Sequence, residues 1–246
     1  MKRQIFKFSK SWPMFWTRLL IRVAWTALPG LLWYLCFHSR IWIQPSCVLI
    51  PNSCTHESVF PIDRLSLGMD LGPADGYSFI TQDAAWTFAF GLLFVWWAVQ
   101  TFKGKLELKQ ICQQLALDWN TIVRVICWNG FFTEAAHFIS QRPRPFVYLD
   151  PNTLGLNPVH YTSFYSGHTS FVAASTTAAF LILLSRKASS FFLLVSLIAA
   201  ETLTLSTAYF RVFSGRHFLT DVICGAIAGT LVAVLITRRS KHLKWL

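Results

Sequence analysis

The residues best suited to chemistry collect in two short stretches in the second half of the sequence. These stretches supply Arg142, Arg144, Ser166, Gly167, His168, Arg211, Arg216, His217 and Asp221. Guanidinium groups bind phosphate oxygens bidentately and stay charged at any relevant pH. A helix that opens at Ser166 would add backbone N–H groups, which favour an anion at a helix N-terminus. The pattern therefore predicts a phosphate site and phosphoryl-transfer chemistry.

The histidines in these stretches supply the groups that such chemistry needs. His217 and Asp221 are four residues apart, so on a helical turn the carboxylate can reach the imidazole. That contact would fix the tautomer and leave the other ring nitrogen as a nucleophile. His168 is then available as the general acid for the leaving group.

The elements that position these residues are predicted to be membrane helices. Hydrophobic residues make up 54% of the 246 residues and charged residues 13%, whereas soluble domains carry about 25% charged residues. A span needs roughly 20 mostly apolar residues. We expect an all-α, polytopic membrane helical bundle with about six transmembrane helices and a single domain over 1–246. The predicted spans are 18–37, 83–102, 117–139, 168–185, 189–209 and 219–237.

The net charge of +11 follows the predicted topology. Basic residues recur at alternate ends of the apolar segments, as the positive-inside rule requires of cytoplasmic loops. This places both termini in the cytoplasm and the loops 38–82, 140–167 and 210–218 on the opposite face. No basic groove with interleaved aromatic residues points to nucleic acid. The 38–82 loop either caps the bundle or gates the substrate.

Other features of the sequence concern packing and cross-linking. Cys47 and Cys54 lie in the 38–82 loop; if this loop is non-cytoplasmic, they could form a local disulfide, and otherwise they remain thiols. Gly225 and Gly229 have GxxxG spacing, which favours close packing of membrane helices. The sequence shows no His/Cys set with zinc spacing.

The chemical residues, in this order, resemble the type 2 phosphatidic acid phosphatase family, whose motifs read K-x6-R-P, P-S-G-H and S-R-x5-H-x3-D. The matching positions are Arg144-Pro145, Ser166-Gly167-His168, and Arg211, His217 and Asp221. The resemblance implies six spans and a phosphohistidine at His217, with Asp221 orienting it and His168 protonating the departing oxygen. It also implies that Arg144, Arg211 and the amides around Ser166 and Gly167 hold the phosphoryl oxygens. It implies no metal and no cofactor.

Three positions depart from the family motifs: His137 replaces the lysine, Tyr165 the proline and Phe210 the serine. The change at His137 matters most, because a neutral imidazole supplies less charge to a phosphate than an ammonium. We expect His137 to be partly protonated with the help of Glu134, so that activity rises toward mildly acidic pH. Alternatively, Arg142 or Arg216 supplies the missing charge.

The function implied by the resemblance is a lipid phosphatase, with a phosphorylated membrane lipid as substrate. The candidates are lipid A and undecaprenyl diphosphate first, then phosphatidylglycerol phosphate and phosphatidic acid. Short loops and basic termini favour a bacterial inner membrane, with the active site facing the periplasm. Alternatives are a lipid phosphotransferase that uses the same phosphohistidine, a non-catalytic phospholipid-binding protein, and a transporter or channel. The sequence leaves the oligomeric state open.

Overall fold

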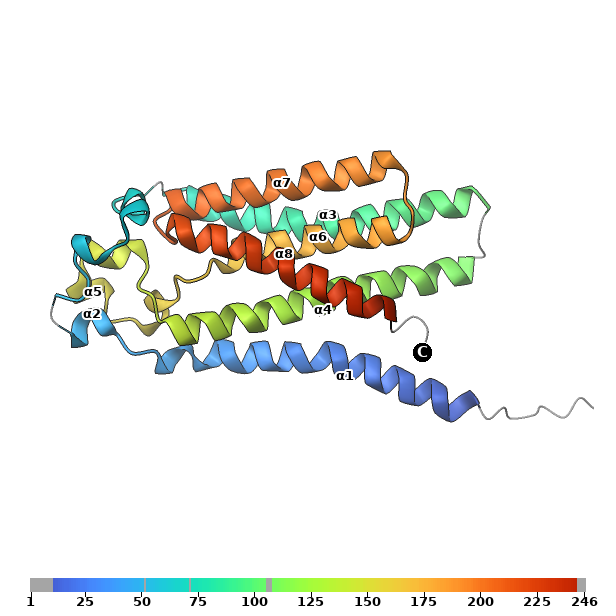
Figure 1. Cartoon of the computed structure of the whole chain (residues 1–246), viewed down its shortest axis with the longest axis horizontal. Coiled ribbons are helices and arrows are strands. Elements are labelled where there is room, and N and C mark those ends of the chain that lie inside the picture. Colours follow the sequence, from blue (N-terminus) through green and yellow to red (C-terminus); the bar gives the residue numbers. More distant parts are fainter. Residues whose placement is uncertain (1–10, 51, 71, 105–107, 243–246) are drawn as a thin grey trace, which may run out of the picture.

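The computed structural model describes residues 11–50, 52–70, 72–104 and 108–242, and within these ranges the fold is all-α (Figure 1). Six long helices lie side by side along the bundle. They are α1 (Ser11–His38), α3 (Ala74–Phe102), α4 (Leu108–Ser140), α6 (Gly167–Ser185), α7 (Ser190–Phe213) and α8 (Leu219–His242). The predicted all-α helical bundle is confirmed.

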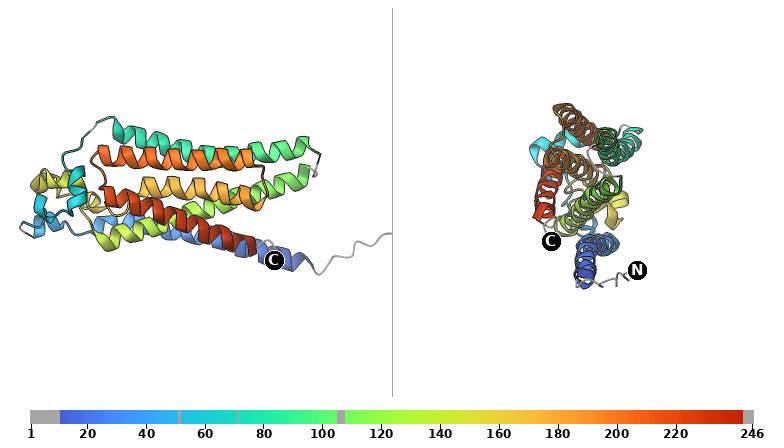
Figure 2. Two further views of the ribbon diagram at one scale, coloured as in Figure 1. Left: turned by 45° about the horizontal axis from the view of Figure 1, so that its top comes forward. Right: turned by 90° about the vertical axis from the view of Figure 1, so that its right-hand side faces the viewer.

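The short elements gather at one end of the bundle (Figures 1 and 2). Between α1 and α3 lie η1 (Ser39–Trp42), α2 (Ser46–Leu49), η2 (His56–Ser58) and η3 (Pro61–Ser66). Between α4 and α6 lie η4 (Pro145–Tyr148), α5 (Pro151–Leu154) and η5 (Pro158–Tyr161). The start of α1 and the end of α8 lie at the opposite end, so the three predicted loops share one end of the bundle.

Four helices are long and apolar enough to cross a membrane: α3, α6, α7 and Leu219–Arg238 of α8. The chain is therefore a membrane protein. The helices α1 and α4 do not meet this criterion, so the predicted count of six spans is not confirmed. In α4 the polar side chains of Arg124, Asn129 and Glu134 lower the hydropathy. These side chains are at most 6% exposed, so they face protein and not lipid.

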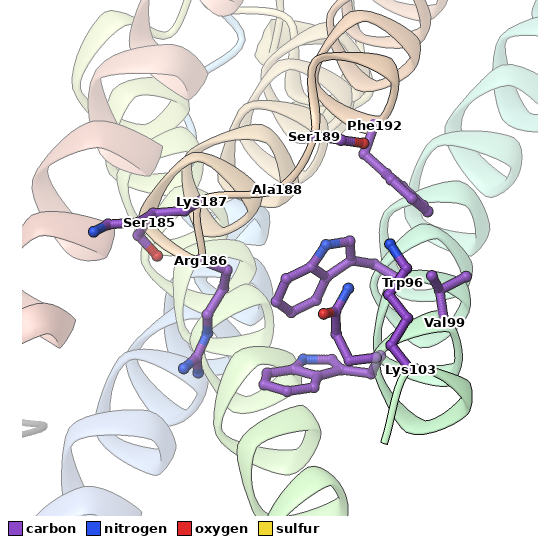
Figure 3. Close-up of a pocket in the computed structure, with 11 residues that line it drawn as sticks. Trp96, Val99, Lys103, Ser185, Arg186, Lys187, Ala188, Ser189 and Phe192 are labelled. Carbon is purple, nitrogen blue, oxygen red and sulfur yellow. The ribbon is translucent and has the colours of Figure 1, made fainter. Parts of the chain in front are cut away.

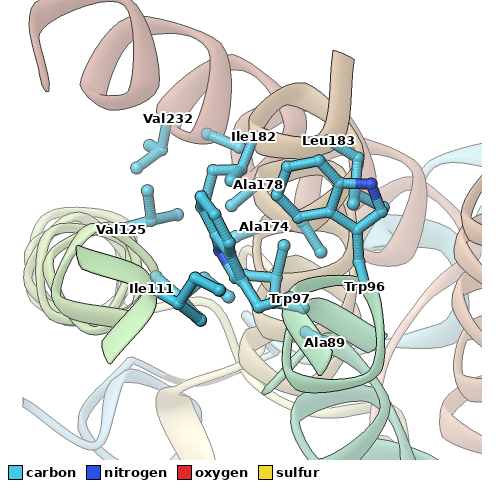
Figure 4. Packing of buried hydrophobic residues seen from close by; sticks show 14 residues of the cluster. Ala89, Trp96, Trp97, Ile111, Val125, Ala174, Ala178, Ile182, Leu183 and Val232 are labelled. Carbon is cyan, nitrogen blue, oxygen red and sulfur yellow. The ribbon is translucent and has the colours of Figure 1, made fainter. Parts of the chain in front are cut away.

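Helix α6 lies at the centre of the bundle and contacts α3, α4, α7 and α8. Of its most apolar window 61% is buried, against 17% for α7. Alanines along α6 let its neighbours approach closely, and Trp96 and Trp97 of α3 pack into the space between them (Figure 4). Large apolar side chains on the outside of the bundle, such as Leu205, remain exposed, as expected of helices that face lipid.

The contact between α6 and α8 explains the two glycines with GxxxG spacing. A Cβ at Gly229 would lie 2.1 Å from the carbonyl oxygen of Ser170, and one at Gly225 would lie 2.7 Å from that of Ser166. Only glycine lets the two backbones approach this closely, so the predicted role in helix packing is confirmed. This contact also fixes the start of α6 against α8, where the motif residues lie.

Helix α1 lies at the edge of the bundle and packs against α4 (Figure 2). The ring of Trp33 occupies the space where a Cβ at Gly130 would lie, 2.3 Å from that position. The close approach brings the C-terminal end of α1 beside Glu134 of α4. Arg40, which follows α1 directly, forms an ion pair with Glu134 there.

A disulfide joins Cys47 and Cys54, so the first of the two alternatives for these cysteines is observed. The pair packs with Ile43, Val147 and Tyr161 in a second, smaller core. The backbone N–H of Cys47 also donates to the Tyr161 hydroxyl at 3.1 Å. The 38–82 loop is thereby fixed onto the 140–167 loop.

Candidate active site

A cavity of about 410 Å³ lies among the residues that the sequence singles out. Its walls include six of the predicted site residues, which come from α4, α6, α7 and the connections between helices: His137, Arg144, Gly167, His168, Arg211 and His217. Aromatic side chains, among them Phe79 and Phe171, complete the lining. The fold therefore brings residues from both chemical stretches of the sequence to one cavity.

His217 is buried at 2% exposure in this cavity wall. Its Nδ1 lies 2.7 Å from the carbonyl oxygen of Ser163. Because a carbonyl only accepts, Nδ1 carries the proton and Nε2 carries a lone pair. Burial, Arg211, Arg144 and His137 together hold the pKa of His217 well below 6.5. The imidazole is therefore neutral near neutral pH, the form that a nucleophile requires.

Asp221 does not make the hydrogen bond to His217 that the spacing predicts. Its Oδ2 lies 3.9 Å from Nδ1 of His217, which is too far for a hydrogen bond. Instead Oδ2 accepts from the hydroxyl of Ser163 at 2.5 Å and from the N–H of Phe218 at 2.9 Å. Asp221 thus fixes the residues on both sides of the imidazole, and the carbonyl of Ser163 sets the tautomer.

Three buried nitrogens of the cavity residues have no hydrogen-bond partner in the described part of the chain. They are Nε of Arg144, Nε of Arg211 and Nε2 of His168. A buried polar group without a partner costs about 1–3 kcal/mol, so native structures rarely contain one without a reason. Burial and the nearby Arg211, Arg216 and Arg40 lower the pKa of Arg144 to about 9. An anion with several acceptor oxygens would accept from the two arginine N–H groups and would offset the crowding of positive charge.

Asp75, in the first turn of α3, binds two of the predicted arginines. Its carboxylate accepts from Nη1 of Arg211 at 2.5 Å and lies 3.1 Å from Nη2 of Arg216. Arg216 does not line the cavity. Its positive charge offsets the negative charge of Asp75. Asp75 could not be predicted from the sequence, because a single acidic residue after a Pro/Gly-rich loop carries no motif.

Arg142 is held by two buried carboxylates. Its Nη1 donates to Asp221 at 2.6 Å and its Nη2 to Asp63 at 2.7 Å. Asp63 is 1% exposed and also accepts from the N–H of Thr220 at 2.9 Å. Arg142 does not line the cavity. It joins the 38–82 loop to the start of α8. Asp63 could not be predicted from the sequence, for the same reason as Asp75.

The amide of Ser166 is already occupied. Its N–H donates to the backbone carbonyl of Asp221 at 3.0 Å, and its hydroxyl lies 3.0 Å from that of Thr169. In this structure the Ser166 N–H is therefore not free to bind a phosphoryl oxygen, and the expected role of the amides around Ser166 and Gly167 stays a prediction. Gly167 does line the cavity; a Cβ there would lie 3.2 Å from Cγ2 of Thr133.

His137 is bound at both ring nitrogens. Because a carbonyl only accepts, its Nε2 carries the proton and donates to the carbonyl oxygen of Tyr165 at 3.0 Å. Its Nδ1 lies 3.5 Å from both Glu134 and Arg40. Glu134 is the closer partner of Arg40, with Nε at 2.6 Å. The carboxylate expected to favour a protonated His137 is thus shared with a permanent cation.

A larger cavity of about 690 Å³ lies where α6 connects to α7, lined by Trp96, Lys103, Arg186 and Lys187 among others (Figure 3). None of the predicted site residues lines it. Arg186 is bound to Asp118 at 2.7 Å. Lys103 and Lys187 add two further basic residues to the lining of this cavity. As for metals, the described ranges contain no group of three or more His, Cys, Asp or Glu side chains that could hold an ion.

The family model of the PAP2 superfamily matches residues 118–245. This is more than half of the 246 residues and includes every predicted site residue. The chain belongs to the PAP2 superfamily. Its members are phosphatases, which places the activity of this chain in the phosphatase class. No curated protein and no solved structure matches the chain significantly. Arg40, Asp63 and Asp75 lie outside the matched range.

Proposed function

We propose that this PAP2 protein is a lipid phosphatase that hydrolyses a headgroup phosphate monoester or diphosphate through a phosphohistidine at His217. The observation that carries the proposal is the set of three unpartnered buried nitrogens, on Arg144, Arg211 and His168, around one cavity. Beside them stands a neutral imidazole whose Nε2 has a free lone pair. Such an arrangement suits a phosphate group better than any neutral ligand.

In the proposed mechanism, Nε2 of His217 attacks phosphorus and the bond from phosphorus to the lipid oxygen breaks. His168 delivers a proton to the departing oxygen. Water then attacks the phosphohistidine, His168 takes a proton from it, and the P–N bond breaks to release inorganic phosphate. Arg144 and Arg211 bind the non-bridging oxygens as charge spreads over them. Asp221 positions His217 through Ser163.

A lipid substrate is supported by the surroundings of the cavity. Its polar groups lie at one end of a bundle whose spanning helices are apolar, and its lining includes Phe37, Phe79 and Phe171. A headgroup phosphate can reach His217 while the acyl chains stay against the helices. Lipid A and undecaprenyl diphosphate are our first candidates, followed by phosphatidylglycerol phosphate and phosphatidic acid.

The proposed location is a bacterial inner membrane, with the site facing the periplasm, both termini in the cytoplasm and α1 and α4 also crossing the bilayer. The disulfide between Cys47 and Cys54 supports this orientation, because disulfides persist in oxidising compartments such as the periplasm. We further propose that 1–246 is one domain, because the short elements of the 38–82 loop bind the site loops directly.

The test is release of inorganic phosphate in detergent micelles that contain a chelator. Release from each of the four candidate lipids is measured with the wild-type protein and with His217→Ala. His56→Ala, in which an exposed side chain is replaced, is the matched control. We expect release from at least one lipid, loss of at least 10³-fold in His217→Ala, which removes the nucleophile, and no change in the control. With a substrate whose phosphate carries a radioactive label, the labelled phosphohistidine should be stable in alkali and should lose its phosphate in acid. Release that survives in His217→Ala would refute the mechanism, and transfer only to an added acceptor lipid would identify a phosphotransferase.

A further inference from the structure

The position of the family lysine presents a question of charge. His137 stands there, and its Nε2–H is bound to Tyr165. The two arginines considered as replacements are also unavailable. Arg142 is held between Asp63 and Asp221, and Arg216 is paired with Asp75. Neither lines the cavity.

A different arginine reaches the cavity from just beyond the N-terminal helix. Arg40 follows α1 in η1 and lines the cavity together with Arg144 and His217. The packing of α1 on α4 places it beside Glu134, which is 4% exposed. Two of its nitrogens, Nε and Nη2, bind the two oxygens of Glu134. Its guanidinium carbon lies 4.4 Å from the centre of the Phe37 ring.

These contacts leave one edge of the guanidinium free. The hydrogen bonds of Arg40 to described residues use Nε and Nη2 and not Nη1, and the side chain is 18% exposed. The bidentate contact with Glu134 fixes the plane of the guanidinium, and the ring of Phe37 limits its movement. A rigid fork with unused N–H groups beside a cavity is the geometry with which arginine binds phosphate. The charge of Arg40 also acts on Arg144, whose pKa it helps to lower.

We propose that Arg40 supplies, from the turn η1 that follows the N-terminal helix, the cationic phosphate contact that the family obtains from a lysine at the position of His137. Glu134 is a positioning residue for Arg40, and His137 positions the Tyr165 segment. The inference rests on the proposed function, since it assigns the third cation of the same phosphate site. It also means that η1, which follows α1 and lies outside the range matched by the family model, completes the site.

The test compares Arg40→Gln with Arg64→Gln. Arg64 lies in the same loop but donates to the backbone carbonyls of Val59 and Glu57. Arg40→Gln removes a charge-assisted hydrogen bond to the phosphate, so we expect kcat/KM to fall about 10- to 100-fold. We expect no change in kcat/KM in Arg64→Gln. Because Arg40→Gln leaves Glu134 buried without its partner, Arg40→Gln/Glu134→Gln is measured beside it. We expect this neutral pair to fold and to show the same loss.

A rescue variant separates a phosphate contact from a structural bridge between α1 and α4. His137→Lys in the Arg40→Gln background returns a cation to the family position but does not rejoin the two helices. We expect it to recover about tenfold in kcat/KM. We also expect Glu134→Gln alone to cost less than Arg40→Gln. No recovery, together with equal losses in Glu134→Gln and Arg40→Gln, would overturn the inference in favour of a structural pair.

Binding of inorganic phosphate to the His217→Ala protein gives a readout that does not require turnover. We expect adding Arg40→Gln/Glu134→Gln to weaken this binding about tenfold. Unchanged binding and unchanged kcat/KM, with His217→Ala still inactive, would overturn the role of Arg40 and leave the proposed function intact. If wild type hydrolyses none of the lipids, the proposed function fails, and phosphate binding alone then decides whether Arg40 is part of an anion site.

Discussion

Replacing Arg142 by glutamine tests whether an arginine that the sequence offers as an alternative phosphate contact instead holds the fold together. The substitution leaves Asp63 and Asp221, which are 1% and 0% exposed, without their shared cation. Breaking a buried ion pair costs about 3–5 kcal/mol. The side chain of Arg142 is 23% exposed, so we reduce this to about 2–4 kcal/mol. For a chain of this size, that loss lowers Tm by about 5–15 °C.

The assay measures thermal unfolding of the purified protein in detergent at one scan rate, together with KM and kcat well below Tm. We expect a large fall in Tm, with KM changed less than threefold. Arg142→Gln/Asp63→Asn should recover part of the lost Tm, because it removes one of the two unpaired charges. An unchanged Tm with KM raised tenfold or more would refute the reasoning and return Arg142 to the phosphate site.

Three further predictions concern charge, pH and packing. Asp75→Asn should tighten inorganic phosphate binding about 3- to 10-fold, since the partly exposed carboxylate no longer competes for Arg211; weaker binding would mean that Asp75 positions Arg211. The pKa of His217 is held well below 6.5, so the pH at which kcat/KM falls off on the acid side, corrected for ionisation of the substrate, should lie below 6.5. It should rise in Arg144→Gln, because a cation that lowers the pKa of His217 is removed. A wild-type value of 6.5 or above would contradict this. Gly229→Ala should lower Tm and activity together, whereas Gly91→Ala, which meets nothing within 4 Å, should change neither; equal Tm values would contradict the close contact of α6 and α8.

The parts of the structure that could be predicted from sequence depend on local patterns. The length of the apolar segments in the sequence predicted the four helices that are long and apolar enough to span a membrane. The GxxxG spacing of Gly225 and Gly229 predicted their close packing, because helical periodicity puts both on one face. The motif spacing predicted that His168 and His217 share one site, and both line the same cavity. For α4, the buried polar residues that serve the site also lower its hydropathy, so length and composition alone do not identify it as a span.

The parts that could not be predicted depend on contacts between distant positions. Arg40 is 94 residues from Glu134, Asp75 is 136 from Arg211, and Asp63 is 157 from Thr220. Each is a single charged residue in or next to an irregular loop, where spacing carries no information about its partner. The hydrogen bond of His217 to Ser163 was missed for the same reason, since its acceptor is a backbone carbonyl 54 residues away.

The arginines that a substrate can contact in this site are those that line the cavity and keep nitrogens unbound by carboxylates, so the number of arginines alone does not decide the charge that it meets. Arg142 and Arg216 have the same side chain as Arg144 and lie within a few residues of motif positions, yet Asp63, Asp221 and Asp75 neutralise them. Arg144 and Arg211 retain buried nitrogens without partners. Two of the three neutralising carboxylates, Asp63 and Asp75, lie in or next to the 38–82 loop. If this loop selects which arginines remain free, exchanging its acidic residues should alter phosphate affinity without any change to a motif residue.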